Sequence, residues 1–246
     1  MHAVALAASS FSERGWELLD RVDYRLARSE EEKEAIYRLR YEAYLREGAI
    51  APNFLKALSD RFDDSENSWL FGLYIDDKLA TSIRVHVASP EHPHSPAVDA
   101  FPEFLEPELE QGKVIVDPNR FVADAEMSRL YPALCYLTVR LGYVACGHFN
   151  ADLGVATARK EHQAFYRRVL RLAPVCEPRP YPTLVKPLAL MTTHYPSVKD
   201  PILQNYPFFR STFFERRKLF ERPLDAQVLP LAPEPANVNR VALASY

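Results

Sequence analysis

Glycine is scarce in this chain of 246 residues, which contains only 7 glycines against 20 prolines. Loops that bind a phosphate group through backbone N–H groups generally need glycine, because the backbone must approach the anion closely. No glycine occurs between Gly112 and Gly142. The segment between these two glycines is therefore poorly suited to form a pyrophosphate-binding loop.

Further absences exclude other classes of protein. No apolar run approaches the length of about 18 residues that a membrane-spanning helix requires. The apolar stretch at 3–8 is too short for a signal peptide, and no basic segment precedes it. The 30 Lys and Arg residues do not exceed the 33 Asp and Glu residues, and the formal net charge of −3 argues against a nucleic-acid partner.

The 3 cysteines, Cys135, Cys146 and Cys176, lack the spacing of a disulfide framework, a metal site or a redox motif. We expect them to be buried, reduced thiols in a cytoplasmic protein. His92 and His94 could supply two metal ligands in a Pro-rich segment, but no third ligand follows at a suitable spacing. We therefore expect no metal site.

The composition is that of a globular protein, with 48% hydrophobic and 26% charged residues. The hydrophobic pattern predicts a strand, a helix, a hairpin, a strand, a long helix, a strand, a helix and final strands. This order is typical of a mixed α/β (α+β) sheet with helices on its faces in a single domain. Strands are predicted at 24–27, 69–75, 79–87, 113–122, 153–156 and within 175–192, and helices after Ser29 and at 127–149 and 160–172.

Four segments are expected along the chain: a helical lead-in at 1–22, the domain at 23–195, an aromatic and basic helical extension at 196–222 and a flexible tail at 223–246. The lead-in is predicted to be anchored by Phe11, Trp16, Leu18 and Leu19. The aromatic residues of the extension have three interpretations. They pack as an ordinary helix, they cover a site, or they bind the inner membrane peripherally through 199–222.

One group of residues suited to chemistry lies in the predicted strand 113–122. Asp117 and Arg120 flank Pro118, which cannot donate a hydrogen bond to a strand ladder. The pattern therefore predicts a bulge, and bulges beside active sites redirect side chains and backbone groups. A local ion pair between Asp117 and Arg120 is the alternative interpretation.

Three other groups precede this strand. Arg40 and Tyr44 lie one helical turn apart and therefore on one face of a helix. Asp60 and Asp63 lie in a polar loop, and Arg84 shares one face of the predicted strand 79–87 with polar neighbours. The alternatives are a solvated helix edge, a solvated acidic turn and an arginine that faces water.

Taken together, the four groups resemble a known family. In order and spacing they are similar to the acyl-homoserine-lactone synthases, which carry an Arg and an aromatic residue on the first helix, a D-x2-D loop, a strand Arg and an E-x2-R-F strand. The segments 159–170 and 176–182, which contain FYRR and PRPYP, show a closer resemblance to the long-chain N-acyl amino acid synthases of the N-acyltyrosine synthase type. The resemblance covers residues 22–195.

The resemblance implies the fold of the Gcn5-related N-acetyltransferases (GNAT), a mixed sheet whose central strands splay apart to admit an acyl thioester. It implies an enzyme that moves a long-chain acyl group from acyl carrier protein to the α-amine of an amino acid. An acyl-homoserine-lactone-type autoinducer synthase, an acetyl-coenzyme A-dependent N-acetyltransferase and a binding module without turnover remain as alternatives. Asp117 stands where the lactone synthases carry Glu, and Ile50 where they carry an aromatic residue.

Acyl carrier protein, with its acyl-phosphopantetheine, is the expected donor and partner, and no other cofactor is expected. Coenzyme A fits poorly, because segment 120–127 lacks glycine and carries Asp124 and Glu126, which would repel a pyrophosphate. An acidic partner would be steered by the basic residues at and before the predicted helix 160–172. These residues are Arg159, Lys160, Arg167, Arg168 and Arg171. A solvated charged face is the alternative.

The resemblance also assigns roles within the site. One of Arg40, Arg84 and Arg120 is expected to bind the carboxylate of the acceptor amino acid. Asp60 and Asp63 would orient that arginine or the acceptor ammonium group, and Tyr44 would line the acceptor site. The expected catalytic residues are Asp117, Arg120, Phe121 and Glu126.

Catalysis is expected from positioning and from backbone groups beside the bulge, which would polarise the acyl carbonyl. Asp117 or Glu126 would relay the proton of the attacking amine. A long acyl chain needs an apolar slot, since each buried methylene contributes about 0.8 kcal/mol. A candidate wall of that slot is the helix 127–149, through Leu134, Leu137, Val139, Leu141 and Val144. Packing in the ordinary core is the alternative interpretation for most of these residues.

Overall fold

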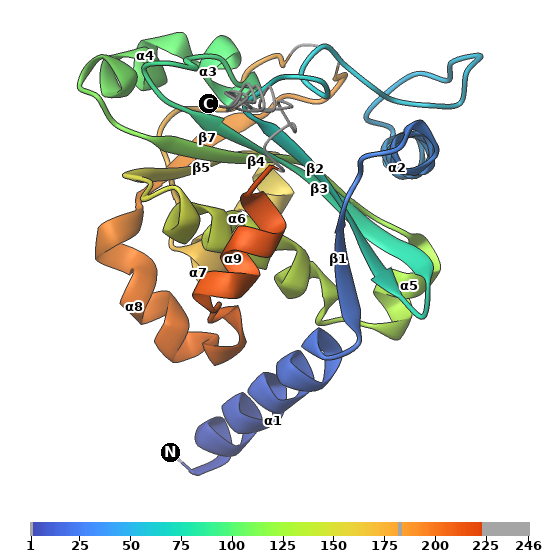
Figure 1. Ribbon diagram of the computed structural model, residues 1–246, viewed down its shortest axis with the longest axis vertical. Coiled ribbons are helices and arrows are strands. Elements are labelled where there is room, and N and C mark those ends of the chain that lie inside the picture. Colours follow the sequence, from blue (N-terminus) through green and yellow to red (C-terminus); the bar gives the residue numbers. More distant parts are fainter. Residues whose placement is uncertain (1, 182–183, 223–246) are drawn as a thin grey trace, which may run out of the picture.

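The structure, a computed structural model, describes residues 2–181 and 184–222, and the tail predicted at 223–246 lies outside them. Among the described residues one mixed sheet runs through the molecule, with the strand order β1-β2-β3-β4-β5-β7-β6 (Figure 1). Neighbouring strands are antiparallel except for β4 and β5, which are parallel. The strands are β1 (Val22–Leu26), β2 (Ser68–Ile75), β3 (Lys78–Ala88), β4 (Ile115–Ala123), β5 (Leu153–Ala158), β6 (Ala173–Pro174) and β7 (Ala189–His194).

Helices cover both faces of the sheet and precede and follow it along the chain (Figure 1). The first of them are α1 (His2–Leu19), α2 (Glu30–Arg46), α3 (Pro96–Ala100), α4 (Pro102–Glu110) and α5 (Ala125–Leu130). The later ones are α6 (Leu134–His148), the 3₁₀ turn η1 (Lys160–His162), α7 (Gln163–Leu170), α8 (Tyr195–Asn205), the 3₁₀ turn η2 (Pro207–Phe209) and α9 (Phe213–Phe220).

Local sequence signals account for the first helix of the domain and for the hairpin. The side chain of Ser29 accepts from the N–H of Glu32, and the Glu32 carboxylate accepts from the N–H of Ser29, which forms a capping box at α2. Between β2 and β3, Asp76 and Asp77 have φ angles of 50° and 61°. Two successive positive φ angles are what a two-residue type I′ turn requires.

The sheet opens between β4 and β5. The two strands pair at Ile115 with Leu153 and at Val116 with Gly154, and no further pair joins them within the described residues. Beyond these pairs β4 continues to Ala123 beside β3, and β5 continues to Ala158 beside β7. The splayed central sheet expected from the resemblance is therefore present.

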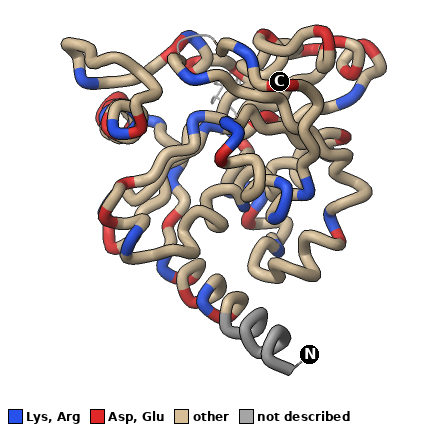
Figure 2. The backbone as a smooth tube through the Cα atoms, turned by 180° about the vertical axis from the view of Figure 1, so that it is seen from behind, with Lys and Arg blue, Asp and Glu red and all other residues tan. Residues whose placement is uncertain are grey.

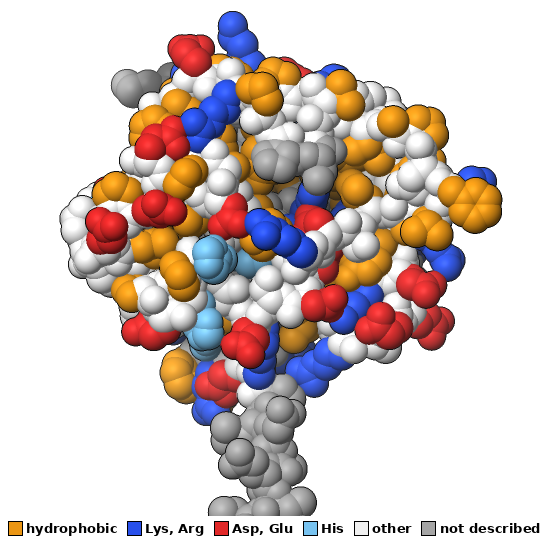
Figure 3. All heavy atoms as spheres, turned by 90° about the horizontal axis from the view of Figure 1, so that it is seen from above, with side chains coloured by type: hydrophobic (Ala, Val, Ile, Leu, Met, Phe, Trp, Pro, Cys, Tyr) orange, Lys and Arg blue, Asp and Glu red, His pale blue; other side chains and the backbone are white. Residues whose placement is uncertain are grey.

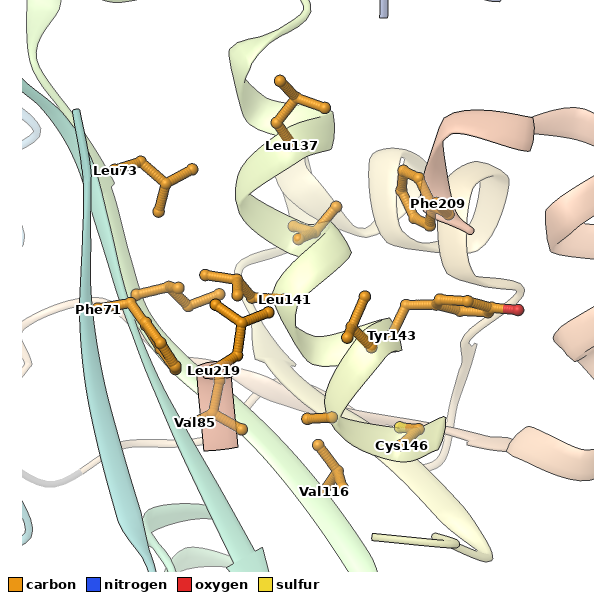
Figure 4. Packing of buried hydrophobic residues seen from close by; sticks show 14 of the residues in the cluster. Phe71, Leu73, Val85, Val116, Leu137, Leu141, Tyr143, Cys146, Phe209 and Leu219 are labelled. Atoms are coloured by element: carbon orange, nitrogen blue, oxygen red, sulfur yellow. The ribbon is translucent and has the colours of Figure 1, made fainter. Parts of the chain in front are cut away.

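The main core lies on one face of the sheet, between β2–β4 and α6. Leu141 of α6 lies between the helix and the strands that carry Phe71 and Val85, and all three side chains are buried (Figure 4). On the opposite face α3 and α4 form a second cluster around Phe101, and α2 packs Leu39 against β4. The site described below lies between these layers.

The prediction of one helix over 127–149 is wrong in its first part. The structure has two helices there, α5 and α6, separated by 131–133. Pro132 lacks the N–H that would continue a helix, and its ring disfavours the helical conformation for Tyr131. Tyr131 accordingly has φ −126° and ψ 78°, outside the helical region.

The C-terminal extension packs into the core along 206–209. Phe208 and Phe209 are fully buried, so the plain packing interpretation holds for them, whereas Phe213 and Phe214 are exposed. A Cβ on Gly15 of α1 would lie 2.6 Å from the Phe208 ring, so glycine is needed for this close approach. Trp16, a predicted anchor of the lead-in, is instead 42% exposed.

Within the described part of the chain, no helix combines the length and the apolar character needed to cross a membrane. Charges of both signs are spread over the fold, and Lys and Arg alternate with Asp and Glu along α2 (Figure 2). Cys146 is buried, Cys135 and Cys176 are partly buried, and all three thiols are free.

Candidate active site

The candidate site begins at a bulge in β4. Ser82 pairs with Val122 and Arg84 with Asn119, so β4 has one residue more than β3 between these pairs. Arg120 occupies the bulge with a φ of 52°. For a residue other than glycine this left-handed conformation costs about 1–2 kcal/mol. The bulge predicted from Pro118 is therefore present, and it directs the Arg120 side chain.

Arg120 is held by an ion pair shared with a second arginine. Its Nη2 and Nε donate to Oδ2 of Asp60 at 2.7 and 3.0 Å. From β3, Arg84 donates to both carboxylate oxygens of Asp60, at 2.6 Å through Nη1 and 3.2 Å through Nη2. Burial alone would raise the pKa of Asp60, but the hydrogen bonds and positive charges of the two arginines outweigh it and hold the pKa well below the ordinary carboxyl range.

A second carboxylate extends this network to α2. Oδ1 of Asp63 lies 2.8 Å from Nη1 of Arg40 and 2.7 Å from Nη1 of Arg84. Oδ2 of Asp63 accepts the N–H of Asp60 at 2.8 Å, which fixes the loop between the two aspartates. We call Arg40, Asp60, Asp63, Arg84 and Arg120 the charge cluster.

The charge cluster is buried and carries excess positive charge, because three guanidinium groups meet two carboxylates. The side chains of Arg40 and Arg84 are 0% exposed and that of Asp63 is 1% exposed. Ions this deeply buried persist only when they are paired and hydrogen-bonded. The sequence grouping of these five residues is thus a spatial grouping as well.

Asp117 and His86 lie beside the charge cluster on paired strands. Oδ2 of Asp117 accepts the N–H of Ala97 at 2.9 Å. Burial raises the pKa of Asp117, and this hydrogen bond offsets only part of the effect. Burial and the charge of Arg84 lower the pKa of His86 to about 3. Both side chains are therefore driven toward their neutral forms.

A cavity of about 610 Å³ occupies the wedge between β4 and β5. This volume lies within the usual range of ligand sites. Its walls come from α2, from the free edge of β4, from the end of β5, from α7 and from the segment between β6 and β7. Representative lining residues are Tyr44, Phe121, Thr157, Tyr166, Tyr181 and Leu188.

Of the residues predicted for catalysis or acceptor binding, Tyr44, Arg120 and Phe121 line this cavity. The guanidinium carbon of Arg120 lies 5.6 Å from the centre of the Tyr44 ring, close enough for a cation–π contact. Arg40 and Arg84 are fully buried behind it. Of the three arginines expected to bind an acceptor, the structure therefore brings Arg120 to the cavity wall.

Glu126 does not join the site. Its carboxylate lies 2.6 Å from Nζ of Lys78, and its side chain is 60% exposed. Ala125 and Ser128 of the same helix line the cavity, so Glu126 lies on another side of α5. This position does not suit the relay of an amine proton that the sequence led us to expect.

The residues of α6 that were expected to form the wall of the acyl slot lie in the main core instead. Leu137 and Leu141 point from α6 into the main core toward the sheet (Figure 4). All five residues predicted for this wall are buried in that core and none lines the cavity. Helical spacing identifies an apolar face, but it does not say whether that face meets a substrate or a sheet.

The basic residues predicted to bind a carrier protein do not share one helix. Helix 160–172 is replaced by η1 and α7, and α7 ends at Leu170, before Arg171, which has a φ of 58°. Arg159 lines the cavity and its side chain is only 12% exposed, in an ion pair with Glu47. The exposed members are Lys160, Arg167, Arg168 and Arg171. Figure 3 shows that charges of both signs are interspersed with apolar side chains on the face it presents.

The structure adds residues that the sequence did not single out. Oδ1 of Asn119 accepts from Nε of Arg84 at 2.8 Å and so fixes that arginine. Tyr181 lines the cavity, and burial raises its pKa. Asn119 could have been found as a polar residue two positions from Asp117 on the same strand face. Tyr181 lies in the PRPYP segment, where no spacing rule points to a cavity.

The N-terminus of α5 is closed by its own side chain. Oδ1 of Asp124 accepts the N–H groups of Glu126 and Met127 at 3.1 and 2.9 Å. These are backbone donors of the kind that bind phosphate in other proteins. No group of three potential metal ligands occurs among residues 2–181 and 184–222.

The profile of the FeeM N-acyl amino acid synthase family matches residues 35–194. The chain belongs to this family. The solved structure of FeeM, an N-acyl amino acid synthase from uncultured soil microbes, has 19% sequence identity and a TM-score of 0.60, over 75% of this chain and 97% of that one. No curated protein sequence matches this synthase.

Two coenzyme A-dependent acyl-homoserine lactone synthases also have similar structures. BjaI has 14% identity and a TM-score of 0.50, over 72% of this chain and 83% of its own. MesI has 16% identity and a TM-score of 0.50, over 77% of this chain and 97% of its own. These likenesses establish the GNAT acyltransferase fold, and the family establishes that this synthase is an N-acyltransferase.

The first prediction concerns the stability of the charge cluster. Asp63→Asn should lower the free energy of unfolding of the synthase by about 3–5 kcal/mol, because it leaves buried arginine charge uncompensated. As a control, Glu34→Gln breaks the exposed ion pair with Arg38 on α2 and should cost no more than about 0.5 kcal/mol. Urea denaturation followed by circular dichroism measures both. Equal losses would contradict the importance of the buried pairing.

The second prediction concerns the pH dependence of stability. Because burial raises the pKa of Asp117, the folded state holds this proton more tightly than the unfolded chain does. Its contribution is therefore lost as the pH rises through the folded-state pKa, whereas Asp117→Asn does not titrate. The free energy of unfolding of Asp117→Asn should therefore rise relative to that of the original protein as the pH increases above the ordinary carboxyl pKa of about 4. Parallel curves would show that Asp117 is not a buried acid.

Proposed function

We propose that this protein transfers a long-chain acyl group from acyl carrier protein to the α-amine of an amino acid and releases an N-acyl amino acid. The observation that carries the proposal is the cavity in the wedge between β4 and β5, in a member of the N-acyl amino acid synthase family. Its apolar walls suit an acyl chain, and the cationic Arg120 on its wall suits an acceptor that bears a carboxylate.

The chemistry needs no covalent intermediate on the protein. The acceptor amine attacks the thioester carbonyl, the C–N bond forms, and the C–S bond breaks. The amine loses a proton, and the departing thiolate of phosphopantetheine takes one up. Within the described residues β4 pairs with β5 only at Ile115 and Val116, and residues 118–123 of β4 line the cavity. The donors that polarise the carbonyl, as charge develops on oxygen, are placed on this part of the β4 backbone.

Arg120 is the proposed binding group for the acceptor carboxylate. It lines the cavity, and the excess positive charge of the cluster favours an anion there. Asp60 orients its guanidinium group before any substrate enters. Asp117 is the remaining candidate to relay the amine proton through water, because it lies close enough to Tyr181, which lines the cavity, to act on it electrostatically.

Two observations support a carrier protein as donor. The N–H groups of Glu126 and Met127 already bind the carboxylate of Asp124, so this helix end is a poor site for the pyrophosphate of coenzyme A. Basic residues both line the cavity and lie exposed at and beyond α7. A single phosphodiester and the acidic surface of a carrier protein match this distribution.

The third prediction tests the donor. Arg167→Glu combined with Arg168→Glu should raise the KM for acyl carrier protein by about tenfold or more, because the changes reverse charge on the proposed docking surface. The KM for a small acyl-pantetheine donor should stay unchanged. Steady-state kinetics with both donors provide the measurement. The same reversal at Arg28 and Arg38, exposed on another part of the chain, is the matched control.

A similar rise in KM for both donors would show that α7 acts on the cavity itself and would remove the carrier-binding role. A similar rise in the control variant would show that only net charge matters.

The fourth prediction tests the acceptor site. Arg120→Lys keeps the charge but not the planar fork, so the KM for the amino acid should rise by about 10- to 100-fold while the KM for the donor stays within about twofold. Arg38→Lys, on the exposed side of α2, should alter neither constant. If Arg120→Lys lowered kcat and left the acceptor KM unchanged, the carboxylate-binding role would fail.

The proposed function is tested directly by supplying the purified protein with acyl carrier protein carrying saturated acyl groups of graded length and with a mixture of amino acids. Mass spectrometry should detect N-acyl amino acids. Acyl-coenzyme A, acetyl-coenzyme A and S-adenosylmethionine are supplied in parallel reactions. Exclusive use of acetyl-coenzyme A, or formation of a homoserine lactone, would replace the proposed reaction with one of its alternatives.

A further inference from the structure

Two loops at one side of the cavity are poor in charge and lie next to each other. The first, residues 48–59, follows α2, and the second, residues 184–188, precedes β7. Ala49 from the first loop and Leu184 from the second line the cavity. The N–H of Val185 donates to the carbonyl of Ala49 at 2.9 Å, so the two loops are joined directly. We call them the rim loops.

The first rim loop carries an exposed apolar tip. Phe54 is 99% exposed and Leu55 is 80% exposed, the highest values among the large apolar side chains that the structure describes. The chain that follows α2 projects away from the rest of the fold (upper right of Figure 1). Two adjacent apolar side chains at the end of a projecting loop indicate contact with an apolar phase outside the molecule.

The tip is held in a defined turn. The side-chain Nδ2 of Asn53 donates to the carbonyl of Ala57 at 3.0 Å. The N–H of Leu58 donates to the carbonyl of Tyr37 on α2, also at 3.0 Å. Between them Lys56 has a φ of 50°, in the left-handed region, which helps the chain to reverse its direction. The turn therefore presents the two apolar side chains to the outside.

The charges of the rim loops are all positive. Lys56 is the only charged residue of the first rim loop, and Lys186 is the only one of the second. Glu47, directly before the first rim loop, is neutralised by an ion pair with Arg159. Apolar side chains flanked by lysines suit the surface of an anionic bilayer, where apolar groups enter the hydrocarbon and ammonium groups remain among the headgroups.

We infer that the rim loops dock on a lipid bilayer that contains anionic headgroups. Phe54 and Leu55 enter the hydrocarbon region, and Lys56 stays at the level of the headgroups. The inference rests on the proposed function in one respect. An N-acyl amino acid is an anionic amphiphile, and a bilayer at the rim loops would receive it directly as it leaves the cavity.

A bilayer matches this surface better than a protein partner does. A stable protein interface buries about 800 Å² on each partner, and a projecting tip with two apolar side chains does not offer such an area. The same tip is well suited to enter a fluid lipid surface. The contact inferred here also differs from the one considered from the sequence, which used residues 199–222.

The experiment is co-sedimentation of the purified protein with two kinds of vesicle. One is phosphatidylcholine alone, and the other is phosphatidylcholine and phosphatidylglycerol in equal parts. The unmodified protein should bind the anionic vesicles more tightly. Phe54→Ser combined with Leu55→Ser should weaken that binding by at least about tenfold, because two apolar side chains no longer leave water. Lys56→Gln should weaken it by about fivefold on the anionic vesicles alone.

The matched control removes two exposed apolar side chains elsewhere. Phe213 and Phe214 of α9 are 60% and 78% exposed. Phe213→Ser combined with Phe214→Ser should leave vesicle binding unchanged. If this variant lost binding as strongly as the rim variant, or lost it alone, the inference would be overturned. It would also be overturned if the unmodified protein bound neither vesicle, or bound both equally well.

A second measurement uses no disruptive change. In Phe54→Trp the added tryptophan should shift its emission to shorter wavelength when anionic vesicles are supplied, and lipids with brominated chains should quench it. The same changes should be absent from Phe213→Trp and from the unmodified protein, which supply the background signal. An indole at position 54 that stays in water would show that the tip does not enter the bilayer.

These measurements need no turnover, so they separate the docking surface from the proposed reaction. Neither Phe54 nor Leu55 lines the cavity. The rim variant should therefore keep the kcat of the unmodified protein with a soluble short-chain donor. Vesicle binding without any N-acyl product would contradict the proposed function alone, whereas product formation without vesicle binding would overturn the inference alone.

Discussion

The separation of β4 from β5 is the constraint on which the site depends. Two ladder pairs, at Ile115 and Val116, hold the strands together, and the cavity exists because the ladder stops there. The chain that follows is unsuited to further pairing. Pro118 has no N–H to donate, and Arg120 leaves the extended conformation. The same few residues that open the sheet therefore also form the wall of the space they create.

The charge cluster links the elements that lie next to this opening. It connects α2, the loop at 60–63, β3 and β4 through side chains that are almost completely buried. The conformational cost of Arg120 in the bulge is offset by its ion pair with Asp60. Because the partners of Arg120 in the cluster are side chains of the protein itself, the fold sets the direction of the Arg120 side chain. Preorganisation of this kind places the electrostatic cost in folding rather than in catalysis.

Much of the fold could be predicted from the sequence, because its signals are local. The helix predicted after Ser29, the hairpin predicted from 69–75 and 79–87 and the alternation of strands and helices all correspond to what the structure shows. The helix break at Pro132 also has a local cause, because proline cannot continue a helix. One helix was predicted across it because the apolar pattern continues on both sides. The predicted helix boundaries were wrong where a single proline interrupts a long periodic pattern of apolar residues.

The site could be predicted only in part. The resemblance to a known family brought together five residues that are far apart in sequence, yet it could not show which of the three arginines reaches the cavity. That distinction depends on burial, and burial depends on how α2 and the strands pack. Spacing likewise placed Glu126 near the chemistry, whereas its side chain pairs with Lys78 on the outside of α5. The apolar face of α6 was identified correctly, but its partner is the sheet and not a substrate.

The segment between β6 and β7 has a further consequence for how such a protein diversifies. Tyr181, Leu184 and Leu188 from this segment contribute a wall of the cavity, yet they belong to no helix and to no named strand. The N–H of Val185 donates to the carbonyl of Ala49 at 2.9 Å, which attaches this wall to the end of α2 and not to the buried ions. New side chains at these positions would reshape the cavity while the arginines and aspartates stay in place. The shape of the cavity can thus vary independently of the residues that hold the sheet open.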